Sequence, residues 1–199
     1  MAAEPRRADE ILEVAARLFY ERGYPSVSIR ALAHASGIQG GSLYHHFASK
    51  EEMLYRICLY GSEGFFAGLG PILTAGGSFS ERLEEFVRAY VLRFWERRYP
   101  IAVLFRESHH LSPAHSEELR LVRRRFQQRF QRFLAEGVAA GEFTVPDPKV
   151  AGIAVLDLLN GIDNWRRTSG RLGIEEVAGN YAVLVAQLVG ARSRKGASV

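Results

Sequence analysis

The sequence contains no long uncharged apolar run and almost no cysteine. No window approaches eighteen uncharged apolar residues, so no segment is expected to span a membrane. Charged residues interrupt everything that follows Arg6 and Arg7, which argues against the apolar core of a secretory signal peptide. The single cysteine, Cys58, cannot form an internal disulfide and is expected in the apolar core. These absences predict a cytoplasmic protein.

Strand patterns, internal repeats and low-complexity tracts are also missing. Of the 199 residues, 47% are hydrophobic and 24% are charged, which is typical of a globular protein and excludes disorder. The net charge of +4 permits a polyanionic partner without requiring one. Residues 1–50 hold six Arg or Lys side chains against five acidic ones. DNA binding by this segment would therefore depend on where its charges are placed.

The first fifty residues predict three helices. Apolar residues recur at helical spacing over 5–23. Ser28 is typical of the residue that caps the next, short helix, which ends near Gly37, and a second short helix is expected over about 40–47. Two short helices joined by a tight turn with glycine are typical of a helix-turn-helix. Ser49 is then expected to cap a longer helix.

The rest of the chain predicts five further helices. Glycines such as Gly64 and Gly68 weaken the end of the long helix, and 74–79 is expected to be an exposed linker. The predicted helices cover 80–98, 100–111, 113–140, 147–168 and 174–192. We therefore predict an all-α protein with an N-terminal three-helix helix-turn-helix DNA-binding domain over 1–50. A helical ligand-binding and dimerisation bundle is predicted over 51–199.

The stretch over residues 28–53 reads SIRALAHASGIQGGSLYHHFASKEEM and resembles the TetR family of bacterial transcriptional regulators. The resemblance rests on Ser28-Ile29-Arg30, Leu32-Ala33, Ala35-Ser36-Gly37-Ile38, Gly41-Ser42-Leu43-Tyr44-His45-His46-Phe47 and Lys50-Glu51. It implies a one-component repressor that binds a palindromic operator in double-stranded DNA as a homodimer. A small hydrophobic effector, held in a cavity of the C-terminal domain, would release the repressor from the operator.

The second short helix has few side chains with which to read DNA. Leu43 and Phe47 are expected to face the core, and the glycines at 40 and 41 would let the helix start approach a duplex closely. Arg30 suits guanine or phosphate, and Lys50 suits phosphate. The resemblance places family DNA contacts at Arg30, Gly40, Gly41, Ser42, Tyr44 and Lys50, and we add Gln39 and His45 as candidates.

Aromatic side chains at helical spacing in the C-terminal region are compatible with core packing or with a ligand cavity. Polar residues also interrupt the apolar run of helix 147–168, next to Trp165. The predicted effector-binding residues are Phe94, Phe105, Phe126, Phe130, Asn160, Asn164, Trp165 and Arg166.

The run Trp165-Arg166-Arg167-Thr168-Ser169-Gly170-Arg171-Leu172 resembles a segment of TetR regulators of steroid-ring and acyl-CoA catabolism. The resemblance implies an acyl-CoA thioester as effector, with Trp165 packing against it and Arg166 or Arg167 meeting phosphate. A hydrophobic drug or metabolite is the other option.

The last two predicted helices carry more apolar residues than one small bundle buries. The residues concerned are Ala151, Ala154, Val155, Leu158, Leu159, Tyr181, Val183, Leu184, Ala186, Leu188 and Val189. The resemblance implies a homodimer through a four-helix interface at this surface. An ordinary buried helix pair is the alternative interpretation.

Two further clusters are interpreted without a binding role. The arginines between Arg120 and Arg132 are expected to form a solvated helix face, with a second DNA surface as the alternative. The histidines His109, His110 and His115 with Glu107 do not match the spacing of a metal site.

The sequence also has no nucleophile elbow or phosphate loop, so we expect no catalytic residue, cofactor or metal. A transcriptional activator with the same DNA module and a non-DNA-binding ligand carrier or enzyme remain alternative functions.

Overall fold

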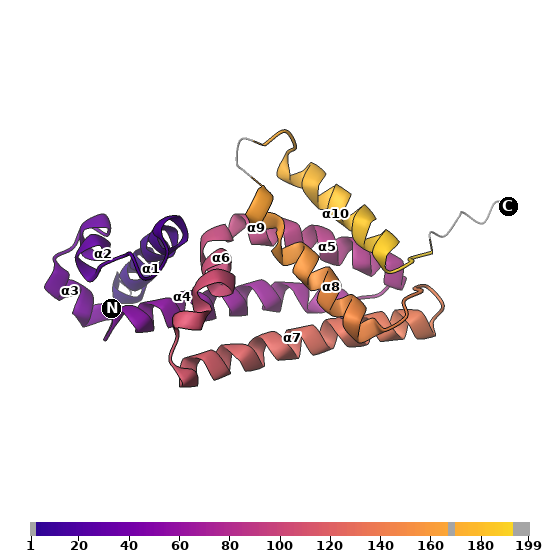
Figure 1. Ribbon diagram of the computed structural model, residues 1–199, viewed down its shortest axis with the longest axis horizontal. Coiled ribbons are helices and arrows are strands. Elements are labelled where there is room, and N and C mark those ends of the chain that lie inside the picture. The colour runs from indigo at the N-terminus through magenta and orange to yellow at the C-terminus, as the bar shows by residue number, and fades with distance from the viewer. Residues whose placement is uncertain (1–2, 167–169, 193–199) are drawn as a thin grey trace. The chain divides into compact units, whose positions relative to one another are not determined.

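The computed structural model describes residues 3–166 and 170–192 and contains no strand in those ranges. The helices are α1 Ala3–Arg22, α2 Ile29–Ala35, α3 Gly40–His46, α4 Lys50–Leu69, α5 Phe79–Glu96, α6 Arg98–Glu107, α7 Pro113–Ala139, α8 Pro148–Asn160, α9 Ile162–Trp165 and α10 Ile174–Leu188 (Figure 1). Two 3₁₀ turns, η1 Pro71–Thr74 and η2 Ser108–His110, join some of them. The all-α prediction is confirmed. None of the helices in the described ranges combines the length and apolar character needed to cross a bilayer.

Local signals in the sequence account for most of the helix ends. The Ser28 hydroxyl accepts the backbone N–H of Ala31 at 3.1 Å, and the Ser49 hydroxyl accepts that of Glu52 at 3.0 Å. Pro113 is the first residue of α7, where its missing N–H has no cost. Gly23 ends α1 with a φ of +77°, a conformation that other residues rarely adopt.

The helix predicted over 147–168 is wrong as a single element. In the structure it is divided into α8 and α9, and Gly161 lies between them. Asn164 donates its backbone N–H to the Gly161 carbonyl at 3.1 Å, the tighter spacing of a 3₁₀ turn. Glycine is a weak helix former, so the chain can tighten here at little cost. Beyond Trp165 the backbone is extended at Arg166, which ends α9.

The chain packs as two compact units. The first consists of Met1–Gly64 and Arg97–Val122, and the second of Phe65–Glu96 and Arg123–Val199. The helices α4 and α7 therefore each run from one unit into the other. The predicted domain boundary at residue 50 separates two functions and not two packing units. It stays a prediction.

The core of the first unit joins α1, the two short helices and the start of α4. Its fully buried side chains include Phe19, Leu32, Leu43 and Met53, and Val103 of α6 belongs to the same cluster. Cys58 is also buried there, as the sequence predicts. In the second unit α10 packs along α5, and the side chains buried on α5 are Leu83, Phe86, Val87, Tyr90, Val91 and Phe94.

Candidate nucleic-acid interface and effector site

The turn between α2 and α3 is built by backbone hydrogen bonds around one glycine. Gly37 has a φ of +66°, in the left-handed region that favours glycine. The backbone N–H of Ile38 donates to the Ala33 carbonyl at 3.0 Å, and that of Gly37 donates to the His34 carbonyl at 3.1 Å. This tight turn joins two helices of seven residues each, as expected for a helix-turn-helix.

Helix α3 buries one of its side chains and leaves the others half-buried or exposed. Leu43 is its buried residue, and Phe47, which directly follows the helix, is buried as well. Tyr44 is 57% exposed, and His45 is exposed beside it. A Cβ atom added at Gly40 or Gly41 would have no neighbour within 4 Å, so the helix start is open to a partner.

All eight predicted DNA-contact residues reach the surface of the first unit. Six of them are exposed, while Ser42 and Lys50 are half-buried. The exposed ones are Arg30, Gln39, Gly40, Gly41, Tyr44 and His45. They lie on α2, at the turn and on α3, so one continuous segment presents them. Their role in DNA contact stays a prediction.

Lys50 is held by an aromatic ring at the start of α4. Its Nζ lies 4.1 Å from the centroid of the Tyr24 ring, a distance suited to a cation–π contact. Burial lowers the pKa of Lys50 and, together with the nearby Glu51 carboxylate, raises the pKa of Tyr24. The ammonium group therefore has a defined position next to the helix-turn-helix.

Two residues that support this surface were not among the predicted site residues. Arg7 of α1 donates to the Ser36 carbonyl in the turn at 2.7 Å, and Glu52 accepts the backbone N–H of Ala48 at 2.6 Å. The spacing of Ser49 and Glu52 is that of a capping box, so the sequence contained a signal for Glu52. Arg7 lies 29 positions from its partner, and no local pattern could have indicated it.

Three of the predicted effector residues belong to an aromatic cluster in the second unit. Phe130 stacks on Phe86 with ring centroids 4.7 Å apart, and Phe126 stacks on Phe66 at 4.3 Å. Phe94 is buried in the same unit. Phe105 lies on α6, which belongs to the first unit and packs on α1.

A polar pair lies within this aromatic region. The hydroxyl of Tyr90, which is buried, donates to Asn160 Oδ1 at 2.5 Å. Burial raises the pKa of Tyr90 well above its ordinary range, so the hydroxyl stays protonated. A partly buried hydrogen-bonded pair of this kind can donate to or accept from a ligand that displaces one partner.

Of the other predicted effector residues, Asn164 and Trp165 are exposed on the second unit and Arg166 is half-buried. Trp165 is 54% exposed, and its Nε1 donates to the Tyr181 hydroxyl at 2.9 Å. Asn164 is exposed, and the Arg166 guanidinium lies 4.0 Å from the Trp95 ring centroid. Arg167, the alternative phosphate ligand, lies outside the described residues.

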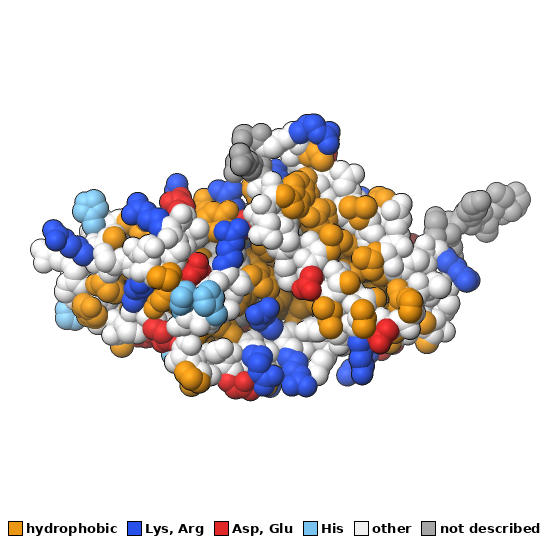
Figure 2. All heavy atoms as spheres, in the orientation of Figure 1, with side chains coloured by type: hydrophobic (Ala, Val, Ile, Leu, Met, Phe, Trp, Pro, Cys, Tyr) orange, Lys and Arg blue, Asp and Glu red, His pale blue; other side chains and the backbone are white. Residues whose placement is uncertain are grey.

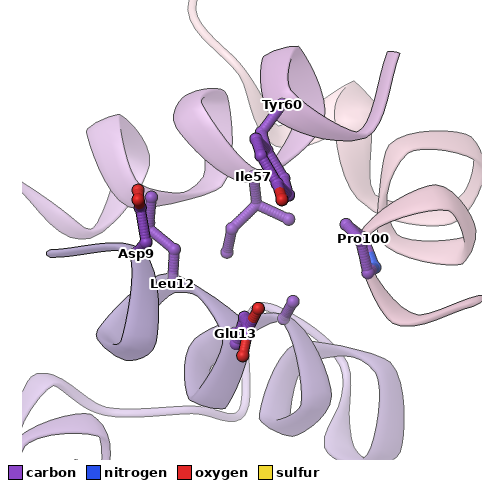
Figure 3. Close-up of a pocket in the computed structure, with 7 residues that line it drawn as sticks. Asp9, Leu12, Glu13, Ile57, Tyr60 and Pro100 are labelled. Carbon is purple, nitrogen blue, oxygen red and sulfur yellow. The ribbon is translucent and has the colours of Figure 1, made fainter. Parts of the chain in front are cut away.

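A small pocket opens in the first unit, and none of the residues that line it is a predicted effector residue. Figure 3 shows Asp9, Leu12 and Glu13 of α1 facing Ile57 and Tyr60 of α4 and Pro100 of α6. Leu12, Ala16 and Ile57 provide apolar surface, while Asp9 and Glu13 are exposed carboxylates. The sequence contained no signal for this hollow, because it forms only where three helices meet.

Helices α8 and α10 leave part of their apolar surface uncovered. Figure 2 shows hydrophobic side chains gathered over these two helices. The exposed large ones, which we call the α8/α10 patch, are Val150, Ile153, Val183, Leu184 and Leu188. Others of the predicted interface, including Val155, Leu159 and Val189, are buried within the unit itself. Val150 and Ile153 were not predicted, because the sequence alone does not reveal which side of α8 the core covers.

The arginine run and the histidines are the two remaining clusters that the sequence analysis singled out. The arginines at 120, 123, 124, 125, 129 and 132 are all exposed on α7. Within the described ranges, no three His, Cys, Asp or Glu side chains are arranged to hold a metal ion. The histidines 110 and 115 instead face Glu107 and Glu51, respectively.

Comparisons with known proteins match both parts of the chain. Residues 11–57 match the family model described as bacterial regulatory proteins, tetR family, and residues 76–189 match the tetracyclin repressor-like, C-terminal domain. The chain is 30% identical over 182 residues to the HTH-type transcriptional repressor KstR2 of Mycolicibacterium smegmatis, covering 90% of this chain and 88% of that protein.

Solved structures of similar proteins share the fold over nearly their whole length. The TetR family transcriptional regulator PfmR from Thermus thermophilus is 35% identical with a TM-score of 0.82, covering 92% of this chain and 99% of that one. The structure of AibR in complex with isovaleryl coenzyme A and operator DNA is 25% identical with a TM-score of 0.83. It covers 94% of this chain and all of that one.

Proposed function

Since the chain belongs to the TetR family of bacterial regulatory proteins, we propose that it is a one-component repressor that binds a palindromic operator. Residues 1–50 bind DNA, and residues 51–199 hold the effector and the dimer partner. The observation that carries the proposal is the outward surface of α2 and α3, where Arg30, Tyr44 and His45 are exposed beside the open glycines of α3. This surface offers side chains and backbone to a major groove.

The α8/α10 patch supports a homodimer as the DNA-binding form. Five large apolar side chains exposed on two neighbouring helices are costly in water and favour a second apolar surface. A two-fold interface brings the same patch of both subunits together and gives two copies of α3. Two recognition helices that read successive turns of DNA, about 34–36 Å apart, require an operator with two inverted half-sites.

An acyl-CoA thioester is the effector class that the second unit supports best. AibR, which has the same fold, has been solved in complex with isovaleryl coenzyme A. In this chain the aromatic cluster around Phe126 and Phe130 suits an acyl chain, and the Tyr90–Asn160 pair suits a carbonyl group. Arg166, held over Trp95, suits a phosphate of the coenzyme.

The proposal is tested with purified full-length protein. A duplex is enriched from a random-sequence pool by the protein and is expected to contain an inverted repeat. A panel of acyl-CoA esters, with isovaleryl-CoA included, and a panel of steroids are then tested for release of this duplex. Enrichment of no sequence, or release by neither panel, would contradict the corresponding part of the proposal.

Replacement of Arg30 by alanine is expected to weaken binding to the enriched duplex by about 1–3 kcal/mol if the guanidinium reads a base. Arg30 is exposed on α2, so the substitution leaves the core intact. Fluorescence anisotropy with the enriched duplex and with a random duplex measures both affinities. An equal loss on the two duplexes would assign Arg30 to phosphate instead.

Replacement of Gly64 and Gly68 by alanine is expected to change the effector concentration needed for release and to leave the affinity for the enriched duplex unchanged. A Cβ at position 64 would overlap the Arg97 guanidinium, and one at 68 would overlap that of Arg93. Both arginines must move, while α4 gains about 1 kcal/mol of helix propensity per alanine.

The matched control for these two substitutions is Gly76→Ala, because a Cβ at this position would meet nothing within 4 Å. Release of the enriched duplex is titrated with the most effective compound of the two panels. Identical titration curves for the double variant and the wild type would rule out a role of this part of α4 in transmission.

A further inference from the structure

The segment 107–118, which covers the end of α6, η2 and the first turns of α7, contacts both ends of the helix-turn-helix. All the residues involved belong to the first unit. One set of contacts reaches Tyr24, which lies just before α2, and the other reaches the first turns of α4, which follow α3. The histidines of this segment, which fit no metal site, take part in both sets.

The contacts at α4 centre on the carboxylate of Glu51. It accepts the backbone N–H of Ser112 at 2.9 Å, and His115 Nδ1 lies 2.9 Å from the same oxygen, Oε1. The His115 ring stacks on Tyr55 with centroids 3.8 Å apart and an interplanar angle of 9°. The Tyr55 hydroxyl then donates to Glu118 Oε2 at 2.6 Å. Four side chains from two helices thus form one connected network.

The contacts at the end of α1 centre on Tyr24. Its backbone N–H donates to Glu107 Oε2 at 3.2 Å, and the His110 ring stacks on its ring with centroids 5.2 Å apart. The same ring holds Lys50, which adjoins Glu51 at the start of α4. The two sets of contacts are therefore linked through Lys50, a predicted phosphate contact.

The electrostatics of two members of this network, Glu51 and Tyr55, favour their hydrogen-bonding roles. Burial opposes ionisation of Glu51, but the Ser112 N–H and His115 together lower the pKa of its carboxyl below the ordinary value. The Tyr55 hydroxyl keeps its proton, because donation to Glu118 raises its pKa to about 12. Glu51 therefore accepts hydrogen bonds as a carboxylate, and Tyr55 donates one as a neutral phenol.

We infer that the segment 107–118 positions the helix-turn-helix for operator binding, with His115 and Glu51 as its central positioning residues. The inference rests on the proposed function, because it assigns a role in DNA recognition to residues that do not contact DNA. The helix-turn-helix between Ser28 and Phe47 is short, and anchoring the chain on both sides restricts how α3 can tilt. Preorganisation of this kind raises the affinity for DNA, because the protein loses less conformational freedom on binding.

The test compares three single variants with the wild type. His115→Ala removes the ring and its hydrogen bond. His115→Asn keeps an N–H donor near the position of Nδ1, and Ser116→Ala changes an exposed neighbour on the same helix and serves as the matched control. Affinity is measured for the duplex enriched by the wild-type protein and for a random duplex, and thermal unfolding is followed in parallel.

His115→Ala is expected to weaken binding to the enriched duplex roughly tenfold, within the range that coupled contacts show. Binding to the random duplex is expected to change less than about twofold, because it depends on the number of basic side chains near phosphate. His115→Asn should restore most of the specific affinity, and Ser116→Ala should match the wild type. A structural role alone would lower the unfolding temperature without changing the ratio of the two affinities.

If His115→Ala does not fold, Glu51→Gln tests the same contact, because it keeps the side-chain volume and removes the charge. Wild-type ratios of specific to random affinity in these variants would overturn the inference and leave the proposed function intact. Failure of the wild-type protein to enrich any duplex would instead overturn the proposed function, on which the inference depends.

Discussion

Replacing Leu43 by alanine is expected to lower the free energy of unfolding by about 2–5 kcal/mol and to abolish operator binding. Leu43 is 1% exposed and is the buried residue of α3, a helix of seven residues. A helix this short has little stability of its own in water, so its position depends on tertiary packing. Without the Leu43 side chain, α3 loses its main contact with the core of the first unit.

The matched control is the next residue along α3. Tyr44 is 57% exposed, so Tyr44→Ala is expected to change stability by no more than about 0.5 kcal/mol. It is still expected to weaken binding to the enriched duplex, since Tyr44 is a predicted DNA contact. Thermal unfolding and fluorescence anisotropy separate the two effects. Equal destabilisation by the two variants would show that α3 is not held through Leu43.

Replacing Leu184 by glutamate is expected to convert the dimer into a monomer and to weaken operator binding by at least about tenfold. Leu184 is 50% exposed within the α8/α10 patch, and a charge there would be buried without a partner in a two-fold interface. Both copies would carry the charge, so the repulsion acts across the symmetry axis. Loss of the dimer separates the two α3 helices that bind one operator.

The matched control is Leu121→Glu, the same substitution at a leucine of α7 that is 41% exposed. It is expected to keep the mass of the wild type in light scattering after size-exclusion chromatography. A dimeric Leu184→Glu variant, at micromolar concentration, would place the dimer interface outside the α8/α10 patch. Monomers from both variants would point to a general loss of structure, which thermal unfolding detects.

The arrangement of the DNA-binding surface could be predicted from local sequence to a large extent. Ser28, Ser49 and Gly37 act through the backbone of their own turn, and the structure places each of them in the expected role. The prediction that Leu43 and Phe47 face inward is also confirmed. These features depend on residues within a few positions of each other, so a linear pattern contains the necessary information.

Contacts between distant segments followed no such pattern. His115 and Glu51 are 64 positions apart, and the sequence suggested only that the histidines near His115 do not form a metal site. Phe105 carries the same side chain as Phe94 but belongs to the other unit. Helical periodicity identifies residues that share a face, but it does not identify the element that the face meets.

Local patterns along the chain are enough to indicate an all-helical protein, the starts of most of its helices, and the short segment with the features of a helix-turn-helix. Packing between helices sets which apolar side chains of α8 and α10 are covered and which remain exposed, and it brings segment 107–118 into contact with both ends of the helix-turn-helix. The difference lies in the range of the interactions. Caps and turns are formed by neighbouring residues, whereas burial and ion pairs depend on how separate helices are brought together.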